Sequence, residues 1–581
     1  MKENSHVRTA ALVAGLVQGL LLLLVELLAE WNLWPISTIG GRFAWYSIAL
    51  AVPTLVVLAW EGGSVRRLGL ASAGLVLVLL LIGAWSGEQT GLRGASGTVV
   101  AVPYFLTVGL GWFVLLPFVQ VWQARGRFVF PYPLLFQYSW NNALTLAISA
   151  AFTGLFKALL SLWAGLFQIV GIEFFQQLFS SRYFNFPVLT TVFAFALYLS
   201  HRHVQAVTVA RRIVLTMFRN LLPVLALMAL LFLAVLPFTG LAPLWRTGYA
   251  TPLLLALVVL MIVFVNAVYQ DGRGKAPYGA GWRHMVEAAV FLLPAYVALA
   301  GYSLGLRVVQ HGWSVDRFWG VLLVTLTGLY AFGYASAVWS RRQAWLGRLG
   351  PINVALAVLV LVLAVLVNSP LLDARRIAAS SQVARLLDGR QTAERFDYRY
   401  LRFKLGRPGE AALSTLASLQ EHPQAALIRE RASAALEQGD PWMELPNVLT
   451  SDADVPRHLR VFPRAHAVDP AYLNMLYRSR DDHWLRPCFA RGRHCLLLSI
   501  DLNRDRKNEY VLLQAQPGSH EGVLLYARGA KGWERVGVLQ IDSPSKGSAA
   551  EQEKLLETGQ FKAVLPPFQD LVVGDHAYRL R

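Results

Sequence analysis

The chain has 581 residues, of which 55% are hydrophobic and only 15% charged, and its mean hydropathy is +0.45. Soluble domains carry about 25% charged residues, so this composition excludes intrinsic disorder, collagen, coiled coil and a disulfide-dense secreted scaffold. The charge is uneven, because the first 369 residues hold 23 Lys and Arg and nine Asp and Glu, whereas the last 212 hold 30 and 26. The sequence therefore predicts a polytopic α-helical membrane domain over 1–369, followed by a soluble α+β part.

Eleven apolar runs are long enough to cross a bilayer. They are Ala10–Leu28, Phe43–Trp60, Leu68–Trp85, Thr98–Trp122, Ala143–Ile172, Tyr183–Ser200, Leu221–Phe238, Ala250–Val268, Val286–Leu306, Trp319–Val338 and Ile352–Asn368. The first run has no small-residue cleavage site and continues into Glu26 and Glu30, so we interpret it as a retained span rather than a signal peptide.

Basic residues in the connections predict the orientation. With the N-terminus in the cytoplasm, the cytoplasmic connections hold 16 Lys and Arg and the opposite connections hold six. This bias follows the positive-inside rule. An odd number of spans then places the C-terminal part outside the cytoplasm, which is the periplasm if the cell is Gram-negative. The net charge of +18 comes mostly from these short connections, so we expect the lipid bilayer, and not nucleic acid, as the partner.

Two connections have an interfacial pattern. Residues His201–Asn220 mix apolar side chains with Arg211, Arg212 and Arg219, which is typical of an amphipathic helix on an anionic membrane surface. Residues Glu173–Ser181 are rich in Phe and predict either an aromatic belt at the outer surface or a re-entrant lid over a cavity.

The C-terminal part divides into two predicted regions. A helical segment covers residues 370–440, and within it Phe396–Phe403 interleaves aromatic with basic residues, which predicts a helix with its aromatic rings packed inward. A small β-rich domain covers residues 441–581. Its expected antiparallel strands are His494–Ile500, Tyr510–Gln514, Gly522–Tyr526 and Val536–Ile541, with one or two more in Phe561–Val573.

The only two cysteines, Cys488 and Cys495, lie in this β-rich region. The intervening Gly492 allows a hairpin that brings them together, and an external location favours a disulfide. A zinc site with His483 and His494 is the alternative, although the paired spacing of structural zinc sites is missing.

One turn has the oxygen ligands of a calcium loop. Asp501, Asn503, Asp505 and Glu509 occupy positions 1, 3, 5 and 9 of such a loop. Arg506 stands where glycine is needed for the turn, and the loop lacks the final bidentate Glu. We therefore favour a salt-bridged β-turn over bound calcium, and we expect no other cofactor.

Lys157 is the sharpest polar feature of the membrane domain, since it lies at the middle of an apolar run. A lysine at the centre of a span costs about 2.5–3.5 kcal/mol and should face a partner inside the bundle. Glu26 is the charged candidate for that partner and Asn266 a neutral one. The alternatives are a structural Lys–Glu or Lys–carbonyl contact, which we favour slightly, and a site for a substrate or coupling ion.

The chain resembles a bacterial inner-membrane family known as domain of unknown function 4153, also called YhgE-like. The resemblance rests on Phe130–Asn142, Leu162–Phe175, Asn368–Asp373, Phe396–Phe403 and the turn at Asp501–Glu509. It implies an inner-membrane location and a suggested transport role, and it supplies no catalytic residue.

These observations favour a secondary transporter or a lipid- or solute-handling membrane protein with a periplasmic accessory domain. The alternative is a non-transporting envelope sensor or scaffold whose periplasmic domain binds a protein partner. An enzyme is the weakest hypothesis, because no zinc-protease, nucleophile-elbow, Walker or Rossmann motif is present. A water-filled cavity at Lys157 would favour transport, and a dry, tightly packed bundle would favour the scaffold.

Overall fold

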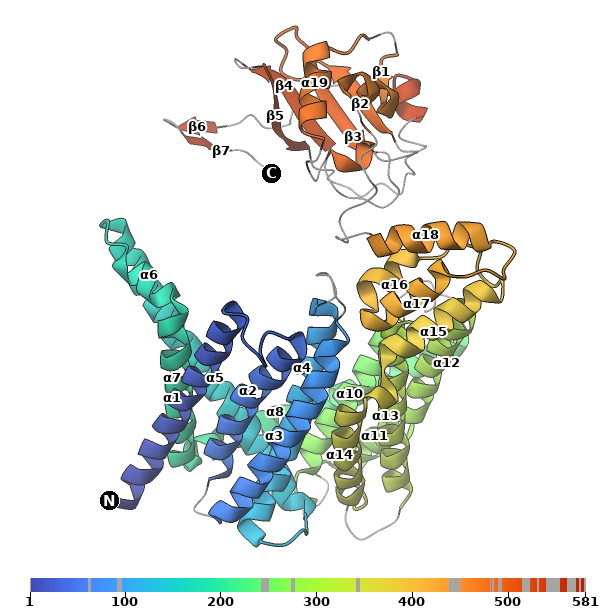
Figure 1. Cartoon of the computed structure of the whole chain (residues 1–581). Helices are drawn as coiled ribbons and strands as arrows, with labels where there is room; N and C mark the ends of the chain where they lie inside the picture. Colours follow the sequence, from blue (N-terminus) through green and yellow to red (C-terminus); the bar gives the residue numbers. More distant parts are fainter. Residues whose placement is uncertain are drawn as a thin grey trace. The chain divides into compact units, whose positions relative to one another are not determined.

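The computed structural model describes most of the chain (Figure 1). The described residues exclude 1, 61–63, 91–96, 242–249, 273–276, 341–344, 438–448, 450, 465, 481, 483–484, 490–493, 515–522, 530–531, 540–553, 562–570, 574–575 and 579–581. The chain folds into two compact units. We call Met1–Glu437 the bundle unit and Gln438–Arg581 the sheet unit, and each is described separately.

The bundle unit contains eleven spans that are long and apolar enough to cross a membrane, which confirms the predicted polytopic fold. Ten spans are single helices and one, Ala280–His311, is two helices broken at Leu292. The helices are α1 (Lys2–Glu30), α2 (Ile39–Ala59), α3 (Val65–Glu88), α4 (Gly97–Arg125), α5 (Tyr132–Ile169), α7 (Arg182–Arg202), α8 (Val204–Thr239), α10 (Ala250–Tyr269), α11 (Ala280–Phe291), α12 (Leu293–His311), α13 (Val315–Trp339) and α14 (Leu349–Leu366).

Two helices begin more than ten residues before their apolar runs. Helix α5 begins at Tyr132, eleven residues before the expected span, and has 38 residues. Helix α8 begins at Val204, so the expected amphipathic helix continues directly into its span. No described turn separates the two parts of either helix, because polar residues at a membrane surface do not by themselves end a helix.

Small residues allow close helix contacts in the first half of the bundle. A Cβ placed on Gly87 of α3 would lie 2.4 Å from the Cα of Gly40 in α2, and one on Gly83 would lie 2.6 Å from the Cα of Ala44. Glycines on α1 approach α7 equally closely. Such contacts replace the hydrophobic driving force, which is weak between helices already surrounded by lipid.

A layer of short helices follows the last span. It consists of α15 (Ala374–Leu387), α16 (Tyr398–Lys404), α17 (Arg407–Ala417) and α18 (Ala425–Glu437). The layer is bonded to the ends of the spans, since the N–H of Val315 donates to the Tyr400 hydroxyl (2.9 Å) and the N–H of Arg407 to the carbonyl of Gln89 (3.1 Å). We call this end of the bundle the layer side. Phe396, Tyr398 and Phe403 are buried, as the inward packing of aromatics predicts.

The sheet unit is built on a five-stranded sheet in the order β1-β2-β3-β4-β5. Its strands are β1 (Leu459–Phe462), β2 (Cys495–Ile500), β3 (Glu509–Gln514), β4 (Val523–Gly529) and β5 (Gly532–Leu539). Four of the strands match the sequence prediction. These four strands pair antiparallel as predicted, and the unpredicted β1 adds a parallel pair with β2. The connection between them contains α19 (Pro470–Arg478), as a parallel pair requires a crossover.

The remaining elements of the sheet unit are small. Two short 3₁₀ helices, η2 (Asp452–His458) and η3 (Arg486–Phe489), flank β1 and β2 in sequence. Near the C-terminus, β6 (Leu571–Val573) and β7 (His576–Tyr578) pair antiparallel as a separate two-stranded sheet. On α19, the buried Tyr472 packs its ring against Tyr510, Tyr526 and Trp533, with centroids 4.6–5.4 Å apart. This aromatic cluster joins α19 to the sheet.

Candidate functional site

Lys157 lies on α5 and is half-buried. Its ammonium donates to the carbonyl of Phe179 and to Oδ1 of Asn185 (2.9 Å). The Asn185 amide donates to the same carbonyl (3.0 Å). Lys157 therefore makes a lysine–carbonyl contact with α6 (Phe174–Ser180) and α7, and Glu26 does not serve as its partner.

Lys157 lies close to the start of α7. Asn185 lies one turn from Arg182, the first residue of α7, and Arg182 pairs at 2.6 Å with Glu30, the last residue of α1. Helix α5 is about 57 Å long, roughly twice the hydrocarbon thickness, so the middle of its apolar run need not coincide with the middle of the bilayer. The position of Lys157 at the centre of the membrane stays a prediction.

Beyond Lys157, residues 158–181 form a hairpin of the end of α5 and α6 that we call the apolar hairpin. Figure 1 shows it extending past the end of α1. Its only charged residue is Glu173, and Ile169 is 83% exposed. Phe167 and Phe175 lie with ring centroids 4.6 Å apart and hold the two arms together. Phe174 is 61% exposed, whereas Phe179 is buried, and both the aromatic belt and the re-entrant lid stay predictions.

Glu26 and Asn266 occupy two other places. Glu26 of α1 accepts a hydrogen bond from the Tyr46 hydroxyl of α2. Asn266 of α10 bonds to the hydroxyls of Tyr132 and Tyr334. The three polar residues predicted to form one intramembrane site thus lie in three separate environments.

The environment of Asn266 is an uncharged network that the sequence analysis missed. Asn353 of α14 donates to Oδ1 of Asn266 (2.6 Å) and accepts from the Tyr334 hydroxyl (2.8 Å). With Tyr132, the network joins α5, α10, α13 and α14. Each member is satisfied by another, which is the usual role of polar residues between membrane helices. In the sequence, three members of this network, Asn266, Tyr334 and Asn353, are isolated polar residues in apolar runs that lie far apart.

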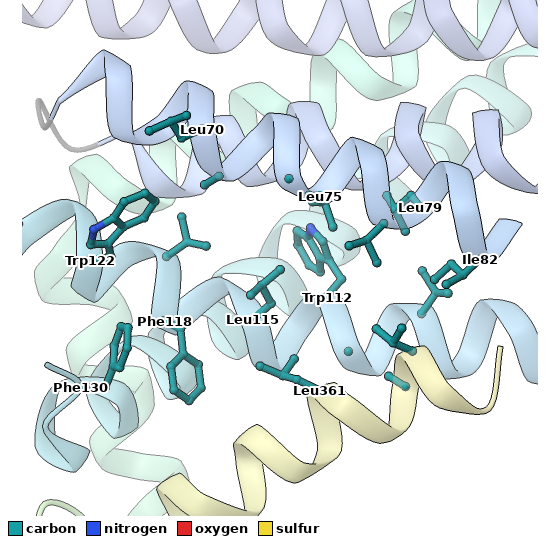
Figure 2. Close-up of a pocket in the computed structure, with 18 of the residues that line it drawn as sticks. Leu70, Leu75, Leu79, Ile82, Trp112, Leu115, Phe118, Trp122, Phe130 and Leu361 are labelled. Atoms are coloured by element: carbon teal, nitrogen blue, oxygen red, sulfur yellow. The ribbon is translucent and has the colours of Figure 1, made fainter. Parts of the chain in front are cut away.

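An apolar groove runs between α3, α4 and α14 (Figure 2). Its volume is about 460 Å³ and every residue that lines it is apolar. Leu70 and Ile82 lie toward opposite ends of the groove in Figure 2, twelve residues and about 18 Å apart along α3. Trp112 and Phe118 of α4 form the opposite wall. A slot of this length and lining fits a linear hydrocarbon chain and offers no partner to a polar solute.

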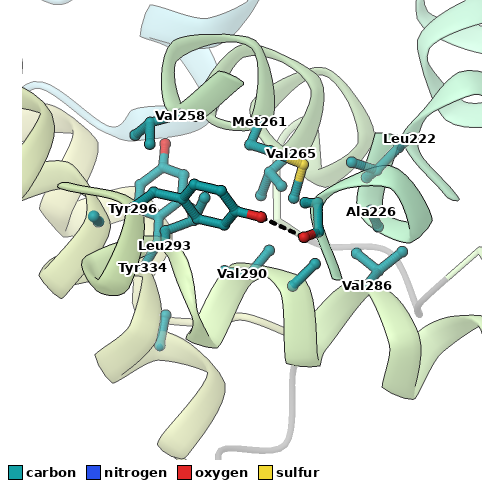
Figure 3. Close-up of a cluster of buried hydrophobic side chains, with 14 of the residues drawn as sticks. Leu222, Ala226, Val258, Met261, Val265, Val286, Val290, Leu293, Tyr296 and Tyr334 are labelled. Atoms are coloured by element: carbon teal, nitrogen blue, oxygen red, sulfur yellow. Dashed lines mark hydrogen bonds between the residues drawn. The ribbon is translucent and has the colours of Figure 1, made fainter. Parts of the chain in front are cut away.

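The other half of the bundle is tightly packed (Figure 3). Val258 and Met261 of α10 are fully buried against Val286 and Leu293 of α11 and α12. The Tyr296 hydroxyl donates to the carbonyl of Ala229, so the one hydroxyl that points into this cluster from α12 is satisfied. The groove is therefore a local feature of the first half and not a general looseness of the bundle.

A small polar pocket lies one turn beyond the groove on the layer side. Its volume is about 20 Å³, room for one water, and Ser86, Asn368 and Arg375 contribute to its lining. Arg375 lies 3.3 Å from Asp373, and its side chain is 12% exposed. Burial lowers the pKa of Arg375, while Asp373 opposes that shift. The pocket closes the groove on this side with polar groups.

Two predicted sites fall in the sheet unit. Cys488 and Cys495 form a disulfide with Cα atoms 5.1 Å apart, as the spacing predicts. His483 of the alternative zinc site lies outside the described residues.

In the predicted calcium turn, carboxylate oxygens of Asp501, Asp505 and Glu509 lie within 4.8 Å of one another. Asp501 accepts the N–H groups of Arg504 (2.6 Å) and Arg506 (3.0 Å), and Asn503 accepts that of Asp505. The described contacts are thus with backbone donors rather than with the expected basic side chains. Arg506 has φ of +67°, the left-handed conformation for which a calcium loop uses glycine. Cation binding stays a prediction.

The comparisons with known proteins identify a family and no activity. The family described as Domain of unknown function (DUF4153) matches residues 45–416, from α2 to α17 of the bundle unit. No curated protein and no solved structure matches the chain. The match ends inside the helical layer, well after the last span, so the layer is part of what the family shares. It covers more than half of the sequence, and the chain therefore belongs to this family.

Proposed function

We propose that this member of the domain of unknown function 4153 family is a lipid-handling membrane protein that holds a hydrocarbon chain in its apolar groove. The observation that carries the proposal is the groove itself, about 460 Å³ in volume and lined by apolar side chains along α3, α4 and α14. Specific ligand pockets combine such walls with a few polar groups at one end. The small pocket containing Ser86 and Arg375 supplies polar groups one turn farther on.

A secondary transporter of polar solutes fits these features less well. Its expected signature was a polar cavity at Lys157, and neither the groove nor the small polar pocket includes Lys157 in its lining. Two of the three N–H donors of the Lys157 ammonium are also engaged, by the Phe179 carbonyl and by Asn185. The lipid branch of the sequence-based hypothesis is therefore the better supported.

The test blocks the groove at a glycine. Gly74 lines the groove, and a Cβ there would meet nothing within 4 Å, so Gly74→Phe places a ring in the groove without disturbing the backbone. Gly69 is the matched control. It lies on the same helix with equally open space, is absent from the lining, and points about 140° away around the helix.

Cross-linking with a phospholipid that carries a photoreactive group on its acyl chain measures occupancy. In the full-length protein we expect labelled peptides from α3, α4 and α14. Gly74→Phe should reduce this labelling about tenfold, and Gly69→Phe should leave it within twofold. Equal labelling of the two variants would contradict the proposal.

We also propose that the protein resides in the bacterial inner membrane with its N-terminus in the cytoplasm and its layer side in the periplasm. The excess of Lys and Arg in the N-terminal-side connections supports this orientation, and the Cys488–Cys495 disulfide fits an oxidising compartment. An alkaline phosphatase fused after Arg581 should be active. An inactive phosphatase together with a bright cytoplasmic fluorescent reporter at the same position would reverse the orientation.

A further inference from the structure

A second cavity lies on the layer side, between the helical layer and the turn that joins α12 to α13. Its volume is about 530 Å³, and we call it the cationic cleft. Its lining includes four arginines, Arg317, Arg385, Arg390 and Arg395, and a single carboxylate, that of Asp397. Asp397 already accepts the N–H of Tyr400 as the cap of α16 (2.8 Å), so it is positioned by the helix and not by the arginines.

Two of the arginines are held in place by uncharged partners. Arg317 donates to the carbonyls of His311 (3.2 Å) and Gly312 (2.7 Å). Arg385 donates to the carbonyls of Val309 (3.3 Å) and Gln310 (2.6 Å). A carbonyl fixes a guanidinium without neutralising it, and each guanidinium keeps further N–H donors. The buried Nε of Arg385 has no partner among the described residues.

The other two arginines are exposed at the rim. Arg390 lies 4.0 Å from Asp388, so its charge is partly balanced. Arg395 interacts electrostatically with Glu394, which does not line the cleft. Ser314 caps α13 at the cleft, and Asp316 in the first turn offsets the partial positive charge of this helix end. The lining itself carries four arginines against one carboxylate, and its neutral Gln, Ser and Thr side chains offer hydrogen bonds to hydroxyl groups.

We propose that the cationic cleft binds a phosphate group, gripped by Arg317, Arg385 and Arg395. Planar guanidinium groups match the oxygens of a phosphate in paired hydrogen bonds, and preorganised arginines lose little entropy on binding. The cleft is lined by the first turn of the α13 span, and Trp313 and Trp319 lie at this end of the span, where tryptophan is typical of the level of lipid headgroups. The phosphate can belong to a lipid headgroup or to a soluble phosphate ester. The proposal is independent of the groove, because the two linings share no residue.

The test uses the full-length protein in detergent and native mass spectrometry. The lipid probe is dioleoyl phosphatidylglycerol, and dioleoylglycerol, which has the same chains without phosphate, is its control. The soluble probe is glycerol 3-phosphate, added as a competitor. We expect phosphatidylglycerol to bind at least tenfold more tightly than dioleoylglycerol. Competition by glycerol 3-phosphate would assign the site to the phosphate ester alone, whereas binding without competition would assign it to a lipid headgroup.

Two variants and one control locate the site. Arg395→Gln removes an exposed charge at no expected cost to folding, and Arg385→Gln removes a half-buried one. Each should weaken phosphatidylglycerol binding at least tenfold. Arg376→Gln, an exposed residue on α15 outside the lining, should change it less than twofold. Wild-type binding by Arg395→Gln, or an equal loss in Arg376→Gln, would overturn the proposal. Loss of binding at the groove in Gly74→Phe with phosphate binding intact would separate this inference from the proposed function.

Discussion

The bundle unit and the sheet unit are held together by different forces, because their sequences were selected for different surroundings. Within the spans, contacts depend on glycines that let backbones touch and on uncharged networks such as that of Asn266 and Asn353. The sheet unit uses a disulfide, a charged helix cap and an aromatic cluster around Tyr472. The helical layer is intermediate, since it belongs to the bundle unit and yet buries an ion pair. The surroundings of each segment thus determine which type of interaction stabilises it.

The largest expected effect is in the layer. Arg402 pairs with Glu410, and their side chains are only 4% and 17% exposed. Arg402→Met leaves a buried carboxylate without its cation and should destabilise the layer by about 3 kcal/mol. The double variant with Glu410→Met should regain most of that stability. Hydrogen exchange of α16 and α17 measures both. If Arg402→Met is as stable as the double variant, the Arg402–Glu410 pair contributes no more than an exposed ion pair does.

Removing the disulfide tests the sheet unit. The bridge joins residues seven apart, and both cysteines are buried. For so short a loop, the paired change Cys488→Ala and Cys495→Ala should cost about 2.5 kcal/mol. Pulse proteolysis of the full chain in urea should show earlier cleavage in the sheet unit and unchanged cleavage in the bundle unit. Equal loss in both units would mean that they unfold together.

Helix contact tests the bundle unit. In Gly87→Ala the new methyl group would meet the backbone of Gly40, so α2 and α3 must separate at a cost of about 2 kcal/mol. Gly74→Ala on the same helix meets nothing within 4 Å and should be neutral or slightly stabilising. Thermal unfolding in detergent, followed by circular dichroism, compares them. Equal melting temperatures of Gly87→Ala and Gly74→Ala would contradict this interpretation.

A pH effect is expected in the sheet unit. Asp469 accepts the Trp533 indole N–H (2.8 Å) and the N–H of Ala471 (2.8 Å), and these bonds lower the pKa of Asp469. A carboxyl group whose pKa is lower in the folded than in the unfolded protein stabilises the fold at pH values above its unfolded pKa, which is about 3.9. This stability is lost as the pH falls through the folded pKa. Asp469→Asn keeps the cap but not the charge, so the acid limb of a urea–pH series should flatten by about 0.5 kcal/mol. If the acid limb of the stability–pH curve is unchanged in Asp469→Asn, the Asp469 carboxylate does not contribute to the pH dependence of stability.

The smallest effect is expected at Lys157. In Lys157→Met the Phe179 carbonyl keeps its bond from Asn185, and a charge is removed from apolar surroundings. Stability should therefore change by less than about 0.5 kcal/mol. Detergent melting curves measure this change. A loss above about 2 kcal/mol would show that the ammonium is structurally essential. A variant that is fully stable and yet shows the same phenotype as deletion of the protein would show that Lys157 has a functional role.

The eleven spans were predictable because the bilayer dictates their length and composition, and the disulfide because Cys488 and Cys495 are close in sequence. The partners of Lys157 were not predictable, because Phe179 and Asn185 belong to two other helices. Strand β1 has four residues and no alternation that identifies it. The groove and the cationic cleft arise from helices distant in sequence, which no local pattern reports.

Helix α5 also has a mechanical consequence. At one end, Tyr132 contacts Asn266 and Tyr269 of α10, and at the other the apolar hairpin is fastened to α7. A single continuous helix thus joins α10 at one end to α7 and the apolar hairpin at the other. Because its length is about 57 Å, any rotation of about 5° at Tyr132 would displace the far tip by about 5 Å.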